Sequence, residues 1–204
     1  MRGLTISVLL GSMLGLALGG CMSRKPADVA RTDIEFRLEE YFEGQTRAYG
    51  LFEDRFGKVR RQFVVDITGT VGGDLLTLDE NFRYADSELD RRVWHIRNLG
   101  GGRYEGQASD IVGTAKGEIF GNALNWRYTL DLKVGEGTWR VQFDDWMFLQ
   151  PDGVLLNRAR VSKWGIELGE VTLAFQRLSG GPETGGEARS RARQSPGAAA
   201  LSSK

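Results

Sequence analysis

The 204-residue sequence has little of the residue types that build disulfides and many metal centres, since it holds one Cys and one His. A single Cys excludes an internal disulfide and a thiolate cluster, and a single His excludes a metal site of several imidazoles. Charge of one sign is not in excess either: 27 Lys and Arg balance 27 Asp and Glu, which argues against a nucleic-acid partner. Only four Pro stand beside 28 Gly, a ratio that favours many short strands joined by turns.

The sequence motifs of the common enzyme classes are missing as well. We find no G-x-S-x-G, no P-loop, no G-x-G-x-x-G and no H-E-x-x-H. Gly100-Gly101-Gly102 lies between strand-like segments with no helix after it, which indicates a hairpin turn and not a phosphate cradle. We therefore assign no catalytic residue, no metal and no cofactor, and favour a non-enzymatic role.

Residues 1–20 are typical of an export signal. Arg2 supplies a positive end, and residues 4–20 carry no charge but are marginal in length for a membrane-spanning helix. The stretch ends in Leu18-Gly19-Gly20-Cys21, which resembles the lipobox of bacterial lipoproteins. That resemblance implies an acylated Cys21 as the first residue of a mature, membrane-anchored chain. An ordinary signal peptide or a weak anchor is the alternative.

The rest of the chain divides into three parts. Residues 21–33 form the lipidated Cys and a polar tether, residues 34–178 hold all 20 aromatic residues, and residues 179–204 are a Gly-, Ala- and Arg-rich tail that we expect to be disordered. Met22 follows the Cys, and the absence of Asp there favours, by analogy with enteric sorting, the periplasmic face of the outer membrane.

Alternation of apolar and polar residues over residues 34–178 predicts an all-β domain. In the clearest strand, residues 124–134, every even-numbered residue is apolar. Glycine-rich turn signals indicate nine or ten strands, after a short helix over residues 37–42. Successive strands of this kind predict an antiparallel up-and-down β-barrel, because closure removes exposed edges. A two-sheet sandwich is the alternative, and charged outer faces disfavour a transmembrane barrel.

Polar residues on the apolar faces are candidates for a site inside such a barrel. Glu80 and Asp145 each lie between two apolar residues on the apolar face of a predicted strand. Asp110 belongs to a series in which the alternation of apolar and polar residues is less regular. A β-bulge at Asp144-Asp145-Trp146 is the alternative that would turn Asp145 outward. By parity, three more side chains could point inward: Arg158, Arg160 and His95. We expect the apolar wall to include Trp94, Trp126, Tyr128 and Trp139.

The domain also resembles a family of bacterial lipoproteins, grouped as domain-of-unknown-function family 3833, over roughly residues 36–178. The resemblance rests on ordered blocks: Tyr41-Phe42-Glu43-Gly44, Gly50-Leu51-Phe52-Glu53, Arg92-Val93-Trp94, Asp110-Ile111-Val112-Gly113, Phe143-Asp144-Asp145-Trp146 and Asn157-Arg158-Ala159. It implies a Cys-anchored lipoprotein with a lipocalin-like (calycin-type) barrel. The family has no established activity to carry over.

We therefore expect a monomeric lipoprotein that binds a fatty acid or other amphipathic lipid in a barrel cavity. Apolar walls would hold the chain of the ligand, and Arg158 or Arg160 would pair with an acidic head. One alternative is a structural or assembly lipoprotein that acts through its surface. The other is a lipid-modifying accessory enzyme, in which Asp145 or Glu80 would carry acid–base chemistry.

Overall fold

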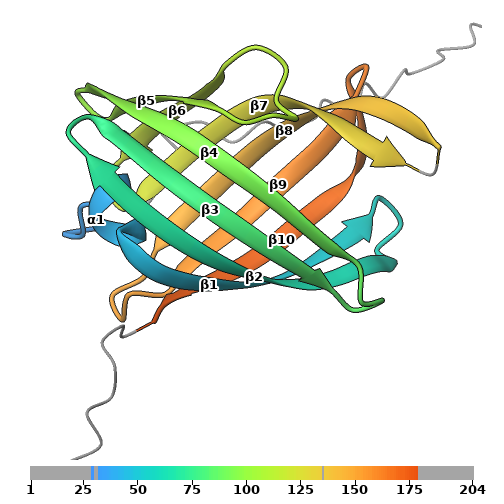
Figure 1. Cartoon of the computed structure of the whole chain (residues 1–204), viewed down its shortest axis with the longest axis horizontal. Coiled ribbons are helices and arrows are strands. Elements are labelled where there is room, and N and C mark those ends of the chain that lie inside the picture. The colour runs from blue at the N-terminus through green and yellow to red at the C-terminus, as the bar shows by residue number, and fades with distance from the viewer. Residues whose placement is uncertain (1–28, 30–31, 135, 179–204) are drawn as a thin grey trace, which may run out of the picture. The chain divides into compact units, whose positions relative to one another are not determined.

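The protein forms a closed barrel of ten antiparallel strands, as seen in a computed structural model that describes residue 29, residues 32–134 and residues 136–178 (Figure 1). Each strand pairs with the next along the chain, and β1 pairs with β10 to close the barrel. The predicted up-and-down barrel with a short helix near its start is therefore confirmed. The predicted export signal, Cys21 and the predicted tail over residues 179–204 lie outside the described residues.

The elements follow in this order: α1 (Leu38–Phe42), β1 (Gly44–Asp54), β2 (Val59–Gly72), β3 (Leu75–Tyr84), β4 (Leu89–Gly100), β5 (Arg103–Gln107), β6 (Ala115–Phe120), β7 (Ala123–Val134), β8 (Gly137–Leu149), β9 (Leu155–Lys163) and β10 (Ile166–Arg177). Within the described part of the chain, no helix combines the length and apolarity that a membrane span requires.

Alternation decides which side chains face the interior. On β7, Leu124, Trp126 and Leu130 are buried, whereas Arg127 between them is exposed. Successive residues of a strand point to opposite faces, so the even-numbered residues of β7 line the interior. The pairing of β7 with β8 then places Asp145 on the same interior face, opposite Trp126.

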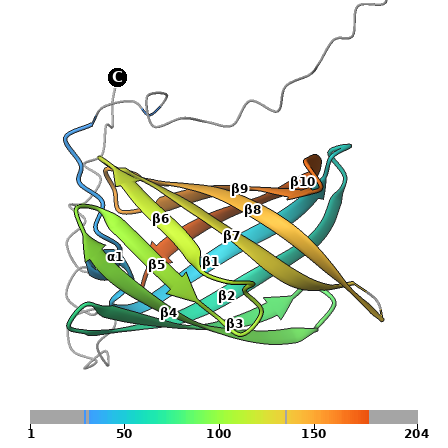
Figure 2. The same ribbon diagram turned by 90° about the horizontal axis from the view of Figure 1, so that it is seen from above.

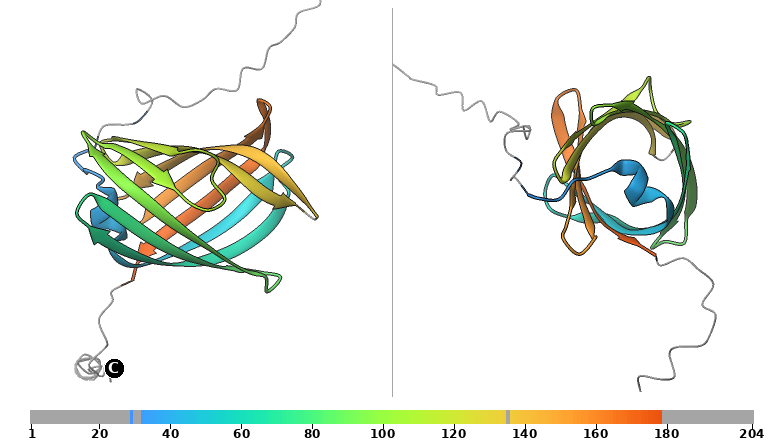
Figure 3. Two further views of the ribbon diagram at one scale, coloured as in Figure 1. Left: turned by 45° about the horizontal axis from the view of Figure 1, so that its top comes forward. Right: turned by 90° about the vertical axis from the view of Figure 1, so that its left-hand side faces the viewer.

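Helix α1 lies inside one end of the barrel, which we call the helix end (Figure 3, right). A helix of five residues has little stability of its own, so burial must hold it in place. Leu38, Tyr41 and Phe42 are all at most 5% exposed, and the Tyr41 hydroxyl donates a hydrogen bond to the carbonyl of Phe175 at 3.1 Å. Gly69 on β2 permits this packing, because a Cβ there would lie 1.8 Å from the Phe42 carbonyl oxygen.

The opposite end, which we call the hairpin end, carries the tight connections β1–β2, β3–β4, β7–β8 and β9–β10 (Figure 2). Strands β5 and β6 are short, and the segment of residues 108–114 between them completes the wall between β4 and β7. Ile111 bridges to Leu130, and the Asp131 amide donates to the Asp110 carbonyl at 3.0 Å. These contacts bring the Asp110 side chain to the barrel wall.

Burial differs between the two ends. Near α1 the inward side chains are tightly packed; Ile67, Leu76 and Leu124, for example, are each 1% exposed. Toward the hairpin end, inward aromatic rings such as Phe63 and Phe82 are only partly buried. Beside β7, β8 and β9, however, Leu130, Val141 and Val161 form a second buried cluster on the hairpin side. The interior is therefore sealed at the helix end and is less fully covered toward the hairpin end only beside β2 and β3, and we call this part the accessible half.

Candidate binding site inside the barrel

Five polar side chains meet in the interior between the sealed half and the accessible half, and we call them the interior cluster. Its members come from β3, β4, the segment of residues 108–114, β7 and β8: Glu80, Arg92, Asp110, Tyr128 and Asp145. Glu80 and Arg92 are directly opposite each other in the β3–β4 pairing. The inward positions that the alternation predicts for Glu80 and Asp145 are confirmed, whereas their ligand-binding role stays a prediction.

Arg92 is the cation of the interior cluster, and Asp110 binds it in a bidentate manner. Its Nε donates to Asp110 Oδ1 at 3.2 Å and its Nη2 donates to Oδ2 at 2.7 Å. Burial acts to lower the pKa of Arg92, but the negative charges of Glu80 and Asp110 outweigh it and raise that pKa. The guanidinium also lies 5.6 Å from the centre of the Phe82 ring. Arg92 is therefore a charged but already paired group.

The other two carboxyl groups hold their protons more strongly than carboxyl groups in water do. Burial raises the pKa of Glu80 to about 7, with Arg92 acting in the opposite direction. Burial also raises the pKa of Asp145 well above its usual value, and the neighbouring charge of Asp144 adds to this effect. Without a ligand, Glu80 is therefore close to its midpoint at pH 7, and ionisation of Asp145 is disfavoured by its burial.

Two buried side chains in and beside this cluster have polar atoms without hydrogen-bond partners in the described structure, although Asp145 also forms a side-chain hydrogen bond with Tyr128. Asp145 is 6% exposed and its Oδ1 accepts no hydrogen bond, while Asn157 is 1% exposed and both its Oδ1 and its Nδ2 are unpartnered. Asn157 faces inward from β9 and is paired with Met147 of β8. The next inward pair along these two strands is Asp145 with Ala159, so Asn157 and Asp145 are diagonal neighbours. Leaving such groups unpartnered costs roughly 1–3 kcal/mol each, so these atoms point to a bound molecule or to water.

Aromatic rings surround the interior cluster. Tyr128 stacks on Phe143 with ring centres 4.8 Å apart, and Trp94 meets Tyr128 edge-on at 5.5 Å. Trp126 lies flat against β5 and β6, since a Cβ at Gly117 would come within 2.4 Å of its ring. Trp94, Trp126 and Tyr128 thus belong to the interior wall, as expected.

The inward orientation expected for Arg158 and Arg160 is wrong. The inward face of β9 carries the odd-numbered residues, among them the buried Leu155 and Ala159. Arg158 points outward and pairs with Glu170 through two hydrogen bonds of 2.7 and 2.8 Å. Arg160 also lies on the outer face, where its Nε is 3.1 Å from Glu167. Neither side chain can reach a ligand inside the barrel.

Two further candidates lie away from the interior cluster. His95 is exposed on the outer face of β4, because its neighbours Trp94 and Ile96 take the inward positions. Trp139 is 44% exposed near the hairpin end of β8, with the Lys163 ammonium 4.4 Å from its ring centre. The alternative of a bulge at Asp145 is also excluded, since the pairing of β8 with β7 and β9 is regular there.

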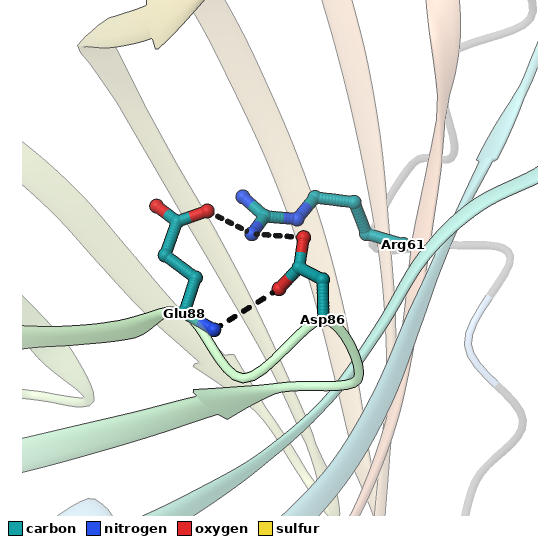
Figure 4. A network of polar contacts seen from close by, with 3 residues as sticks. All are labelled: Arg61, Asp86 and Glu88. Carbon is teal, nitrogen blue, oxygen red and sulfur yellow. Dashed lines mark hydrogen bonds and ion pairs between the residues drawn. The ribbon is translucent and has the colours of Figure 1, made fainter.

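The hairpin end carries a second polar group beside the accessible interior (Figure 4). Arg61 of β2 contacts Glu88 at 2.5 Å and Asp86 at 3.5 Å, and its guanidinium lies 3.5 Å from the centre of the Tyr84 ring. A shallow pocket at this place is lined by Arg61, Tyr84 and Asp86 and by neighbours such as Val59. The Arg61 charge is thus compensated at the rim of the barrel.

Comparison with known protein families identifies the chain. The sequence profile of the family described as protein of unknown function (DUF3833) matches residues 15–177. The chain belongs to this family. The DUF3833 match contains Cys21, all ten strands and every member of the interior cluster. No curated protein matches the sequence of this DUF3833 member.

The sequence did not single out Arg92 or Asn157 as site residues. Arg92 follows Arg91, so the sequence alone did not separate an outward from an inward arginine. Asn157 shares its parity with the apolar Leu155, Ala159 and Val161, and that signal could have identified it. Among the described residues, no three His, Cys, Asp or Glu side chains are grouped so as to hold a metal ion.

Proposed function

We propose that this DUF3833 protein binds an amphipathic small molecule, such as a lipid, inside its barrel. One observation carries the proposal: Asp145 Oδ1 and the amide of Asn157 are buried and unpartnered in an interior whose walls are largely aromatic and aliphatic. Binding sites for small molecules commonly combine apolar walls with a few convergent polar groups, and this interior has both.

The two halves of the interior suggest how the ligand lies. A molecule entering from the hairpin end passes partly buried rings such as Phe63 and Phe143 before it meets the interior cluster. The sealed core around α1 lies beyond the cluster. The polar end of the ligand would therefore lie deepest, and its apolar part would pack against the rings nearer the hairpin end, where burial of apolar surface favours binding.

A binding experiment on the purified full-length chain tests this proposal. We expect 1-N-phenylnaphthylamine, a fluorescent apolar probe, to bind and to quench the emission of tryptophans in the wall such as Trp94. Asn157→Leu removes the unpartnered amide at nearly constant volume, so it should weaken binding of a polar-headed competitor at least tenfold without destabilising the barrel. The control is Asn81→Leu on the outer face of β3, which should not change binding. If the wild-type chain binds neither probe nor competitor, the proposal fails.

We also propose that an acylated Cys21 anchors the protein at the periplasmic face of the outer membrane. The support is the lipobox-like Leu18-Gly19-Gly20-Cys21, which lies within the DUF3833 match. Mass spectrometry of the mature protein should find a diacylglyceryl group on Cys21, and Cys21→Ala should release the chain from the membrane fraction. An unmodified Cys21 in membrane-associated protein would contradict the anchor.

A further inference from the structure

We infer that the polar end of the ligand is a cation that donates hydrogen bonds, such as an alkylammonium group, and not a carboxylate. This inference rests on the binding function proposed above and names the chemistry of its ligand. It departs from the fatty acid that the sequence suggested.

The balance of charges inside the barrel is the first argument. The interior cluster has three carboxyl groups, on Glu80, Asp110 and Asp145, but one guanidinium, on Arg92. Asp110 already engages Arg92 through Nε and Nη2. An anionic head would find the one guanidinium already engaged and would further disfavour ionisation of the two remaining carboxyl groups, whereas a cationic head would supply the counter-charge that lets them ionise.

The unpartnered atoms give a second, independent argument. Asp145 Oδ1 and Asn157 Oδ1 are both acceptors, and they lie on neighbouring inward positions of β8 and β9. An ammonium group has several N–H donors and can serve both oxygens, whereas a carboxylate head would present only acceptors to them. The Asn157 Nδ2 can then donate to a hydroxyl or carbonyl further along the ligand.

The rings around Asp145 give a third argument. Tyr128 and Phe143 stack next to Asp145, and Trp94 lies edge-on to Tyr128. Their stacking covers one face of Tyr128 and one of Phe143, and a ring face that stays open attracts a cation by about 0.5–2 kcal/mol, most strongly where water is excluded. A carboxylate head gains no such attraction from them.

The proton balance follows from the same groups. In the ligand-free interior burial raises the pKa of both Asp145 and Glu80, and a nearby cation lowers both pKa values because it favours the ionised forms. Binding of an ammonium head should therefore release protons and tighten as the pH rises from 5 to 8. The charged or titratable groups that bear on this site are Glu80 and Asp79 of β3, Arg92 of β4, Asp110, Tyr128 of β7, and Asp145 and Asp144 of β8. The paired inward residues of β9 and β10 here, Asn157 with Leu173 and Ala159 with Val171, carry no charge.

Three probes with the same chain and different heads test the inference: octylamine, 1-octanol and octanoate, each titrated into the full-length chain at pH 7. We expect octylamine to bind at least tenfold more tightly than 1-octanol, and octanoate to bind most weakly. Asp145→Asn should remove most of the octylamine preference and change octanol affinity less than threefold. Asp131→Asn, on the outer face of β7, is the matched control and should change neither.

Calorimetry keeps the test decisive if Asp145→Asn does not fold. Octylamine binding to the wild-type chain, measured in buffers of different ionisation enthalpy, should show net proton release that Glu80→Gln reduces. Octanoate binding more tightly than octanol, or octylamine binding without proton release, would overturn the inference. If none of the three probes binds, the proposed binding function fails instead, so the two failures are distinguishable.

Discussion

Glu80 gives the barrel a stability that depends on pH, and Glu80→Gln should remove that dependence. Glu80 is drawn into the interior from the middle of β3, where burial raises its pKa from 4.5 to about 7. Below pH 4.5 the carboxyl is protonated in both the folded and the unfolded chain, and its ionisation costs nothing. Between pH 4.5 and 7 the unfolded chain releases the proton while the folded chain keeps it, so the free energy of unfolding falls.

The magnitude follows from the size of that pKa change. At about 1.4 kcal/mol for each pH unit, a rise from 4.5 to about 7 corresponds to roughly 3 kcal/mol once the pH is above 7. Gln has nearly the same shape as a protonated Glu and does not titrate. We therefore expect the free energy of unfolding of the wild-type chain to fall about 2–3 kcal/mol further between pH 5 and pH 8.5 than that of Glu80→Gln.

Urea unfolding of both chains at pH 5 and pH 8.5, followed by tryptophan fluorescence, measures this difference. Asp79→Asn on the same strand is the matched control, because Asp79 faces outward and Arg91 lowers its pKa, so it stays ionised throughout this range. Coupling to Asp145 acts in the same direction, since removing the Glu80 charge lowers the pKa of Asp145. Equal pH dependence in the wild-type chain and Glu80→Gln would refute the interior placement of this carboxylate.

Three further substitutions test the packing and the charge pairing of the barrel. Gly117→Ala should lower the free energy of unfolding by about 1–3 kcal/mol, because the new Cβ would lie 2.4 Å from the Trp126 ring. Asp110→Asn should lower it by roughly 2–3 kcal/mol in denaturant titrations, because it leaves the partly buried Arg92 without its counter-charge. Ser87→Gly should raise the free energy of unfolding by up to about 1 kcal/mol, and with it the melting temperature, because Ser87 has a φ of 71°, which glycine adopts without strain.

Each of these changes has a control of the same type. Gly72→Ala adds a Cβ that meets nothing within 4 Å, so it should not lower the melting temperature. Asp131→Asn breaks an ion pair with Arg140 on the outer face, where solvent screening makes the loss much smaller than for Asp110→Asn. Equal losses from the two Asp substitutions would mean that Arg92 is solvated and not enclosed.

The strand pattern predicted the barrel well because most of its faces are unambiguous. Over residues 124–134 of β7 each even-numbered residue is apolar and each odd-numbered residue is polar, so the sequence alone identifies the inward face. The same alternation correctly placed Glu80 and Asp145 inside. Closure of the sheet needed no special motif, since successive antiparallel strands with one apolar face leave two edges that can pair.

The pattern failed on β9, where apolar residues stand at both parities. The apolar residues Val154 and Leu156 indicated that the even-numbered residues of β9 face inward. Val154, however, precedes the strand, and Leu156 is 44% exposed. What settles the orientation of Arg158 is its pair with Glu170 on the neighbouring strand. This contact joins residues 12 positions apart, so the alternation of residues along one strand cannot predict it.

The position of the interior cluster links the pH dependence of barrel stability to binding of the proposed ligand. The interior cluster lies between the core sealed by α1 and the partly buried rings nearer the hairpin end. With no cation there, the pKa values of Asp145 and Glu80 are raised, because a buried charge without compensation is costly. A cationic head would make that proton unnecessary and would use the unpartnered Asp145 Oδ1 and Asn157 Oδ1. The pH dependence that destabilises the empty barrel at high pH is therefore the same one that should strengthen binding of an ammonium head, and both effects should become smaller together in Glu80→Gln and in Asp145→Asn.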